Sequence, residues 1–532
     1  MRTVVGPTGR VVIVGAGLAG LSAALRLTGA GREVTVLERE PEPGGRAGRL
    51  TLGGYHFDTG PTVLTMPDLI AEALDCVGEP LDRWLDLRPL DPAYRAFYPD
   101  GSTLDVHPDP AAMAAEIERV CGPAEAAGYL EFVEFVGRLY RLQMNRFIDR
   151  NLDSPLGLLG PSLARLVALG GFRRLAPVVA RYLKDPRTQR VFSFQAMYAG
   201  LAPHQALAIY AVIAYMDTVA GVYFPAGGMH ALPLALAGAA AKHGVRFRYG
   251  TTAERVEVVN GRARAVITSG GERFPADVVV LNPDLPVAYR DLLPPRLLPA
   301  RVARLRYSPS CVVLHLGSRA EYRATAHHNI HFGRAWRTVF DEVIDRGELM
   351  SDPSVLVTNP TRTDPALAPA GRQTYYVLAP APNLTTGSRL EWASLGPRYR
   401  DELVATLERR GYRGFGAAVE VEQVVTPRDW AAAGMAAGAP FAAAHSFRQT
   451  GPFRPSTLAP GLENVVFVGS GSQPGVGVPM VLLSGRLGAE RVTGADRAYR
   501  SRASRRDRFA TAAATVHGSV HGSAAGSETM AP

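Results

Sequence analysis

The residues best suited to chemistry lie in a glycine-rich segment near the start of the chain. Gly15-Ala16-Gly17-Leu18-Ala19-Gly20 has the spacing GxGxxG and directly follows the apolar run Val11 to Val14. In this pattern the first glycine permits a tight strand-to-helix turn, the second lets a pyrophosphate approach the backbone, and the third lets helix and strand pack closely. The helix N-terminus offers free N–H groups to the phosphates. The segment therefore predicts a dinucleotide site.

An acidic residue follows at the expected place. Val34 to Leu37 predicts a second strand, which ends on Glu38, 18 residues after Gly20. A carboxylate there can accept hydrogen bonds from ribose hydroxyls. It favours an unphosphorylated adenosine ribose, which means FAD or NAD rather than NADP.

A second glycine-rich segment lies near the C-terminal end. A predicted buried strand, Asn464 to Val468, leads into Gly469-Ser470 and then Gly477-Val478-Pro479, before a predicted helix over 480–491. Pro474 stands where a third glycine would be needed, so this is not a second dinucleotide motif, and no separate NAD(P)H domain is expected. The helix N-terminus can stabilise negative charge on a reduced redox ring. The alternative is a loop that serves only as a turn.

Further elements must position these segments. Val245 to Val280 predicts a meander with strands at 246–249, 255–259 and 264–268, followed by a return to the parallel sheet at 277–282. Residues 76–224 have mainly helical periodicity, with helices predicted over 116–120, 129–140 and 163–183. Residues 301–439 mix strands at 311–316 and 375–378 with a helix over 399–409.

Composition limits the class of protein. The chain has 532 residues, 47% hydrophobic and 20% charged, which predicts a folded core and two domains or one domain with large insertions. Cys76, Cys121 and Cys311 are odd in number and far apart, which excludes a disulfide framework and fits a reducing compartment. His327, His328 and His331 lack a convergent thiolate or carboxylate, so no metal site is expected.

The charge pattern does not favour nucleic acid as a partner. The net charge is +9, but six arginines and Asp507 within residues 497–508 contribute +5 of it, in a tail expected to be disordered. No signal peptide is visible. The longest weakly charged stretch, 206–229, is interrupted by Asp217 and ends in Pro225 and two glycines, so we expect a buried helix and a strand and no membrane span.

Two segments after the second strand resemble the flavin amine oxidase superfamily. They are Pro43-Gly44-Gly45-Arg46, which follows Glu38-Arg39, and Phe57-Asp58-Thr59-Gly60-Pro61-Thr62. The resemblance selects FAD over NAD and implies that Arg39, Gly45, Arg46, Gly60, Pro61 and Thr62 lie along the cofactor. It also implies that Val256 in the meander contacts the adenosine half through its backbone. The alternative for Arg46 is a salt-bridged surface arginine.

Mid-chain segments make the resemblance more specific. The chain from about residue 10 to 495 is similar to the bacterial phytoene desaturase family, on the glycine segments above and on Phe192-Ser193-Phe194-Gln195, residues 221–228, residues 327–333, residues 364–369, residues 375–380 and residues 475–479. The resemblance implies an oxidoreductase of carotenoid biosynthesis that desaturates CH–CH bonds of phytoene and its intermediates to lycopene-type polyenes, with hydride passing to FAD. It further implies a cytoplasmic enzyme bound peripherally to the membrane surface that holds the substrate, with a quinone or oxygen as electron acceptor.

These observations together predict an α/β fold. We expect a Rossmann-type FAD-binding domain of the amine-oxidase kind, made discontinuously from residues 1–75, 225–300 and 440–495. An inserted α+β domain that binds substrate and associates with the membrane would comprise residues 76–224 and 301–439, and residues 496–532 would form the basic tail.

The substrate site is expected to be apolar. A hydrocarbon has no polar handle, so catalysis must depend mainly on positioning C–H bonds against the cofactor. No acid or base is firmly assigned; the resemblance makes Asp149 and Arg150 weak candidates, and a surface ion pair is the alternative. The basic stretch 155–183, with arginines among Leu, Val and Ala, fits either a membrane-surface helix or an ordinary amphipathic helix on the core.

The sequence is also compatible with other functions. Within enzymes they are desaturation of dehydrosqualene or a hydroxylated carotenoid such as hydroxyneurosporene, redox-neutral carotene isomerisation, and amine oxidation. An amine oxidase is expected to carry an aromatic cage and, in many members, a cysteine for covalent flavin near the C-terminal glycines, and residues 469–479 contain neither. A non-enzymatic prenyl-binding escort protein shares the fold but dispenses with FAD, whereas this chain keeps the phosphate and ribose elements.

Overall fold

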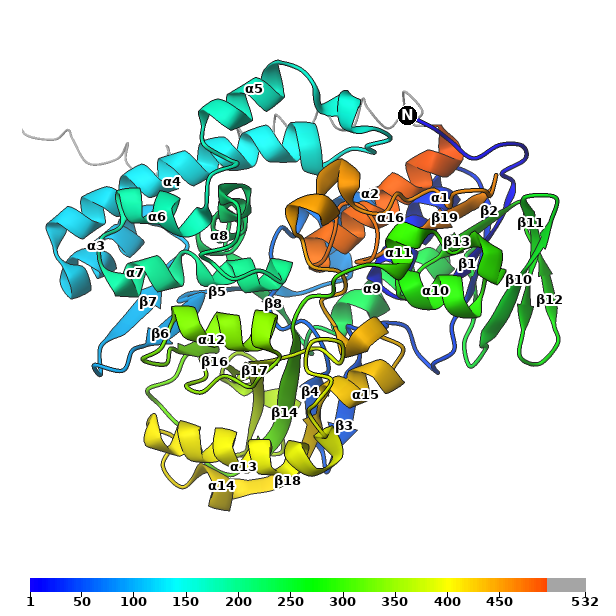
Figure 1. The fold of residues 1–532 in the computed structure, drawn as a ribbon. Helices are drawn as coiled ribbons and strands as arrows, with labels where there is room; N and C mark the ends of the chain where they lie inside the picture. The colour runs from blue at the N-terminus through cyan, green and yellow to red at the C-terminus, as the bar shows by residue number, and fades with distance from the viewer. Residues whose placement is uncertain (495–532) are drawn as a thin grey trace, which may run out of the picture.

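The computed structural model describes residues 1–494, and a five-stranded parallel sheet lies at one side of the molecule (Figure 1). The predicted tail, 496–532, lies outside the described residues. In spatial order the strands are β19 (Val465–Phe467), β13 (Val278–Leu281), β1 (Arg10–Val14), β2 (Glu33–Leu37) and β9 (Arg246–Arg248). The assignment of residues 246–249 to the meander was wrong: β9 pairs in parallel with β2, because helix α9 (Ala231–Lys242) brings the chain back to the sheet edge.

Both faces of this sheet are covered, as the continuous apolar strands predict. Val11 and Ile13 belong to one core cluster and Val12 and Val14 to another, because alternate residues of a strand point to opposite faces. The first face packs against α1 (Leu18–Gly29), α9 and α16 (Val478–Thr493). The second packs against α10 (Leu285–Asp291) and a three-stranded meander of β10 (Ala253–Val259), β11 (Arg262–Thr268) and β12 (Arg273–Pro275).

A seven-stranded mixed sheet is the second large sheet of the molecule. Its order is β18 (Val419–Val425), β14 (Ser310–Ser318), β17 (Gln373–Ala381), β16 (Val355–Thr358), β15 (His328–His331), β6 (Tyr94–Phe97) and β7 (Thr103–Val106). Leu314 and Tyr375 pack on one face against α13 (Trp392–Arg409), the helix predicted over 399–409. Cys311 and Tyr376 point to the other face, which leaves that face free to form the wall of a cavity.

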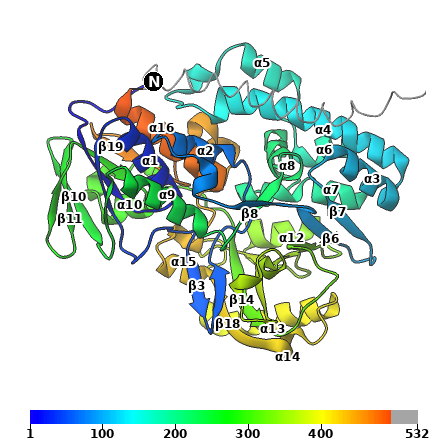
Figure 2. The same cartoon turned by 180° about the vertical axis from the view of Figure 1, so that it is seen from behind.

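Helices from residues 110–218 form the end of the molecule opposite α13 (Figures 1 and 2). The helix predicted over 163–183 is two helices, because the chain turns at Gly170, whose φ of +78° ends the first one. The helices are α3 (Pro110–Cys121), α4 (Pro123–Gln143), α5 (Pro161–Ala168), α6 (Leu175–Tyr182), α7 (Pro186–Val191) and α8 (Ala211–Thr218).

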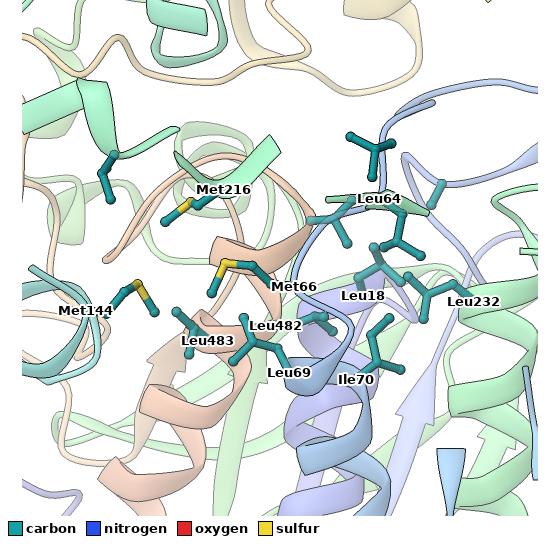
Figure 3. Close-up of a cluster of buried hydrophobic side chains, with 14 of the residues drawn as sticks. Leu18, Leu64, Met66, Leu69, Ile70, Met144, Met216, Leu232, Leu482 and Leu483 are labelled. Atoms are coloured by element: carbon teal, nitrogen blue, oxygen red, sulfur yellow. The ribbon is translucent and has the colours of Figure 1, made fainter. Parts of the chain in front are cut away.

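Short elements connect these parts. β3 (Arg49–Leu52) and β4 (Tyr55–Asp58) form a hairpin around Gly53-Gly54, and β5 (Leu87–Leu90) pairs with β8 (Val222–Pro225). The remaining helices are α2 (Asp68–Asp75), α11 (Ala300–Ala303), α12 (Arg337–Asp341), α14 (Phe415–Ala418) and α15 (Pro427–Ala432). One apolar cluster joins α1, α2, α8 and α16, with Leu18, Met66, Met216 and Leu483 among its members (Figure 3). The parallel sheet and the helical end therefore share a continuous core.

Candidate active site

The turn between β1 and α1 needs glycine for steric reasons. Gly15 has a φ of +98°, in the left-handed region. A Cβ on Gly20 would lie 2.2 Å from the carbonyl oxygen of Gly15, so the helix could not approach the strand as it does. Gly17 precedes the helix without a side-chain cap. Gly17, Leu18 and Ala19 line a large cavity, so the helix N-terminus faces that space with N–H groups that have no intrahelical partner.

The Glu38 carboxylate is held beside this turn by two backbone hydrogen bonds. Its Oε2 accepts a hydrogen bond from the Ala16 N–H at 2.6 Å, and its Oε1 accepts one from the Glu40 N–H at 3.0 Å. The side chain is buried and lines the cavity at the end of β2. Each carboxylate oxygen keeps a further lone pair, which is the requirement for accepting a ribose hydroxyl.

Arg46 joins the first glycine turn to the C-terminal glycine loop. The loop that carries it is held beside the turn, because Gly44 N–H donates to the Ala16 carbonyl at 3.0 Å. The Arg46 Nη1 donates to Ser470 Oγ at 2.5 Å, and its Nη2 lies 3.4 Å from Asp284 Oδ2. The guanidinium is therefore part of the site rather than an isolated surface ion pair.

Asn282 is a site residue that sequence reasoning missed. It follows β13, and its Oδ1 accepts from the Gly20 N–H at 3.0 Å while its Nδ2 donates to the Val468 carbonyl at 3.3 Å. A Cβ on Gly17 would lie 2.8 Å from Asn282 Oδ1, and a Cβ on Gly469 would lie 2.8 Å from its Nδ2. The Asn282 side-chain amide thus lies between the two glycine segments and contacts both. A polar residue at the carboxyl end of a central buried strand was the available signal.

A buried cation holds the C-terminal loop from within the protein. Arg454 is fully buried, and it donates to the carbonyls of Ser470 at 2.5 Å and Ser472 at 3.0 Å. Burial lowers the pKa of Arg454 to about 10, so its guanidinium stays charged at neutral pH. His445 Nε2 lies 3.4 Å from the Val476 N–H, and burial holds the pKa of His445 well below its usual range. The neutral imidazole can therefore accept that hydrogen bond.

The N-terminus of helix α16 also lies at the cavity wall. Gly477 has a φ of +107° and precedes α16 without a side-chain cap, and Pro479 occupies the first turn. Gly477, Val478 and Pro479 line the same cavity as Gly15 and Gly17. The two glycine segments, far apart in sequence, therefore face one space.

The residues of this space fit a flavin dinucleotide. Backbone N–H groups at two helix ends, a carboxylate at the end of β2 and a guanidinium between the two loops match the phosphate, ribose and ring regions of such a molecule. The cradle depends on missing side chains, since a Cβ on Gly60 would lie 1.8 Å from the Arg46 carbonyl oxygen. The cavity has a volume of about 1090 Å³, which is large enough for a long cofactor beside a substrate.

Away from the glycine segments the cavity wall is mainly apolar. It is formed by helices α5 and α8 with their flanking segments and by the free face of the seven-stranded sheet. The lining includes Phe147, Leu158, Leu166, Phe172, Phe194, Met197, Ile209, Ile213, Met216, Ile330, Phe332, Leu356, Tyr376, Leu378 and Trp430. The prediction of an apolar space beside the cofactor residues agrees with this lining.

The structure brings most of the predicted site residues to this cavity and leaves four away from its lining. The predicted residues that line it are Gly15, Gly17, Leu18, Ala19, Glu38, Arg39, Gly45, Arg46, Gly60, Pro61, Thr62, Arg150, Gly469, Ser470, Gly477, Val478 and Pro479. Ala16 and Gly20 lie behind the turn, as described above. Val256 is buried against Leu292, to whose carbonyl its N–H donates at 2.8 Å, and residues 251–253 occupy the cavity wall in its place. Asp149 forms an ion pair with Arg486.

The three clustered histidines have separate partners. His327 Nδ1 lies 2.7 Å from Thr363 Oγ1, His328 Nδ1 lies 2.9 Å from Thr358 Oγ1, and His331 Nε2 lies 3.1 Å from the Tyr412 hydroxyl. Burial lowers the pKa of His328 and of His331 to about 3. Within residues 1–494 no group of three or more His, Cys, Asp or Glu side chains has a metal-binding arrangement.

Exposed aromatic rings line the cavity where it reaches the protein surface. Phe447 is 56% exposed, and its ring centroid lies 6.5 Å from that of Phe172 and 5.8 Å from that of Phe453. All three also line the cavity. Leu156 and Leu159, which flank the lining residue Leu158, are 74% and 68% exposed. Among residues 1–494, no helix combines the length and hydropathy needed to cross a bilayer.

Comparisons with known proteins cover almost the whole chain. A family model described as flavin containing amine oxidoreductase matches residues 18–493. The chain is 58% identical over 497 residues to a phytoene dehydrogenase of Streptomyces griseus, covering 93% of this chain and 97% of the relative. It is 39% identical over 487 residues to a zeta-carotene-forming phytoene desaturase of Myxococcus xanthus, covering 91% and 93% of the two chains. The solved structure of an oxidoreductase from Methanosarcina mazei has a TM-score of 0.61 at 16% identity over 90% of this chain and 99% of that chain, which shows a shared fold.

Proposed function

We propose that this chain, which belongs to the flavin-containing amine oxidoreductase family, is an FAD-dependent desaturase that converts phytoene to lycopene-type polyenes in carotenoid biosynthesis. The observation that carries the proposal is one cavity that joins both glycine segments to a mainly apolar wall. A dinucleotide and a long hydrocarbon need these two surfaces side by side. The two relatives named above, of which the matches cover 97% and 93%, support the same reaction class.

The cofactor is held by the residues of the two glycine segments and the loops between them. We assign FAD contacts to Gly15, Gly17, Leu18, Ala19, Glu38, Arg39, Gly45, Arg46, Gly60, Pro61, Thr62, Gly469, Ser470, Gly477, Val478 and Pro479. Bound FAD supplies a hydride acceptor. The chain supplies the positive ends of α1 and α16 and the Arg46 guanidinium, which favour negative charge on the phosphates and on the reduced ring.

The apolar wall orients the substrate and excludes water. A hydrocarbon gains affinity in proportion to the apolar area removed from water, about 25 cal/mol per Å². Side chains such as Phe194, Ile213 and Phe332 therefore hold the polyene by shape and not by hydrogen bonds. Holding its C–H bonds against the cofactor is the main source of rate enhancement for a substrate without polar groups.

The partner surface and the electron acceptor are parts of the same proposal. The exposed rings of Phe172, Phe447 and Phe453 at the cavity opening, with the exposed basic residues Arg173 and Arg448 beside them, suit an anionic lipid surface from which phytoene enters. The reduced cofactor must pass its electrons on, and we infer a quinone dissolved in that lipid, or oxygen, as acceptor.

We also propose the discontinuous domain division set out from the sequence. Residues 1–75, 225–300 and 440–494 contribute all five strands of the parallel sheet, and residues 76–224 and 301–439 contribute the helical end and the seven-stranded sheet, which supports this division. Cavity residues come from both parts, so substrate and cofactor meet at their junction.

Two measurements test the proposed function. Purified protein is expected to carry a flavin absorption spectrum, and expression in a host that accumulates phytoene is expected to yield coloured polyenes. Gly17→Val should abolish both, because its side chain would meet Asn282 and block the phosphate approach. Gly157→Ala, where a Cβ has nothing within 4 Å, is the matched control and should keep both. A folded, colourless wild-type protein, or phytoene left intact by a flavin-loaded one, would contradict the proposal.

A further inference from the structure

One buried carboxyl on the cavity wall has no role in cofactor binding. Asp217 lies near the end of α8, is 2% exposed and lines the cavity beside Met216 and Tyr198. Its Oδ2 accepts a hydrogen bond from the Tyr94 hydroxyl at 3.4 Å, and its Oδ1 has no hydrogen-bond partner within the described chain. Sequence reasoning treated Asp217 only as an interruption of an apolar stretch.

The other acidic side chains of the cavity lining are differently placed. Glu40 pairs with Arg39, Asp284 with Arg46 and Asp291 with Arg290, and Glu38 accepts backbone N–H bonds. Among residues 1–494, Asp217 forms no ion pair. A buried carboxyl without a full set of partners destabilises the folded protein, so its presence in a mainly apolar wall needs a reason. A hydrocarbon cannot form a hydrogen bond with it, so substrate binding is not that reason.

Side-chain contacts connect Asp217 to residues assigned to the cofactor. Its neighbour Met216 shares a core cluster with Met66 and with Leu483 of α16 (Figure 3). A chain of contacts also connects Tyr94, the partner of Asp217, to Thr62. The Tyr94 ring lies 5.6 Å from the His328 ring, and His328 contacts Thr358. The Thr358 Oγ1 in turn lies 3.4 Å from the Thr62 Oγ1. Asp217 is therefore connected by packing to the loop assigned to FAD, and both line the same cavity.

We propose that Asp217 is the catalytic proton acceptor of the desaturation. One C–H bond of the substrate breaks with its electron pair leaving as hydride to FAD. The C–H bond on the adjacent carbon gives its proton to an Asp217 carboxylate oxygen, and the electron pair of that bond becomes the new C=C bond. FAD gains two electrons and one proton as hydride, and the carboxyl gains the other proton. This inference rests on the proposed function.

The surroundings of Asp217 strengthen it as a base. Burial raises the pKa of Asp217 well above its usual range, and the nearby Tyr94 and Gln195 side chains only partly oppose the effect. A raised pKa makes the carboxylate a better proton acceptor and moves its titration toward the working pH. Tyr94 from β6 and Tyr198, whose phenol pKa values are raised by burial, stay neutral there, and so does His328, whose pKa is lowered to about 3. Because only the ionised form can accept a proton, turnover should rise with pH through the titration of Asp217 and then level off.

The test measures anaerobic reduction of bound flavin after mixing the holoenzyme with phytoene in vesicles. Asp217→Asn keeps the shape of the side chain and removes the base, so flavin reduction should slow about a hundredfold or more while flavin content stays at the wild-type level. Asp109→Asn makes the same chemical change at the N-cap of α3, outside the cavity lining, and should react as the wild type does, since Asn caps as well as Asp.

Two further readouts keep the inference testable if Asp217→Asn folds poorly. Tyr94→Phe leaves Asp217 in place but removes one hydrogen bond to its ionised form, so the rise of the rate with pH should move to higher pH. The infrared carbonyl band of a protonated carboxyl, measured on the apoprotein at a pH above the ordinary titration range of carboxyls at about 4, should lose intensity in Asp217→Asn and not in Asp109→Asn. Unchanged flavin reduction by flavin-loaded Asp217→Asn, or an unchanged pH profile in Tyr94→Phe, would overturn the inference. A wild-type protein that leaves phytoene intact would contradict the proposed function instead.

Discussion

At the scale of single residues, Ser470 is the point where two arginines meet the C-terminal glycine loop. Arg46 donates to its side-chain oxygen and Arg454 to its carbonyl oxygen, each at 2.5 Å. Arg454 comes from the loop just before β19, whereas Arg46 reaches across from the N-terminal part of the chain. The loop is therefore fixed both from inside its own segment and from the opposite end of the sequence.

Replacement of Arg46 should weaken cofactor binding more than it affects folding. Arg46→Met removes the hydrogen bond to Ser470 and the ion pair with Asp284 but keeps an unbranched side chain. Loss of a charge-assisted hydrogen bond costs about 1.5–3 kcal/mol, so the Kd for FAD should rise about tenfold or more. Flavin fluorescence titration of the apoprotein measures this.

Arg49→Met is the control for that variant. Arg49 lies three residues further along, and its only ion pair among the described residues is a 3.7 Å contact with Glu42 on the surface. Equal FAD affinities for the two variants would show that Arg46 has no special place in the site.

At the scale of secondary-structure elements, the segment from 155 to 172 has two faces with different tasks. Leu158, Leu163 and Leu166 face the cavity, whereas Leu156, Leu159 and Val167 are exposed. The stretch was expected to be one amphipathic helix on either the core or a membrane. In the structure a short turn and α5 place apolar side chains on both sides, which suits an element between a lipid surface and a hydrocarbon site.

The aromatic opening should control contact with lipid. The double variant Phe447→Ser/Phe453→Ser should bind anionic vesicles about tenfold or more weakly, because each aromatic ring buried in lipid contributes about 1.5–3 kcal/mol. Cosedimentation with vesicles measures the binding. Flavin content should not change, since the two rings themselves are 56% and 40% exposed.

A matched exposed residue serves as the control for the opening. Val259 on the meander is 46% exposed, and Val259→Ser should leave vesicle binding unchanged. Equal binding by the double variant and the wild type would contradict the assignment of this opening to the membrane.

At the scale of the whole molecule, several buried histidines make folding sensitive to acid. Burial lowers the pKa of His315 to about 4 and that of His328 and His331 to about 3, and holds the pKa values of His327 and His445 well below their usual range. An unfolded histidine has a pKa of about 6.5, so between that pH and the lower folded values the unfolded chain binds more protons. The stability that these histidines contribute is then complete above about pH 6.5 and is lost as the pH falls.

The free energy of unfolding should therefore fall by about 1.4 kcal/mol per pH unit for each such histidine between about pH 6 and 4. Urea unfolding of the apoprotein at several pH values measures the slope. His328→Gln removes one titrating group and should reduce the slope by about one proton. His56→Gln is the control, because His56 lies on the partly exposed β3–β4 hairpin. A stability that does not change between pH 6 and 4 would contradict this account.

The sequence by itself determined the parts of the site whose geometry is local. A strand, three spaced glycines, a helix and an acidic residue predict the first turn, because φ values and close backbone approach depend on neighbouring residues. The structure has that turn at Gly15 to Gly20, with Glu38 at the end of the next strand. The sequence also contains a local signal for the break between α5 and α6, the pair Gly170-Gly171. The helical periodicity on both sides of this pair nevertheless predicted one continuous helix.

The tertiary structure decided which groups meet across long separations. Asn282 contacts both glycine segments, and the sequence did not indicate that they lie together. Strand β9 joins the parallel sheet, although its residues suit a meander equally well. Asp149 is paired with Arg486 from α16. Asp217, which the sequence showed only as an interruption of an apolar stretch, is a buried carboxyl of the cavity wall that forms no ion pair among residues 1–494. Local periodicity reports which side of an element is buried, but whether a buried charge finds a partner depends on chain segments brought there by packing. Whether a carboxyl in an apolar cavity is paired or free to react is therefore decided by the tertiary structure.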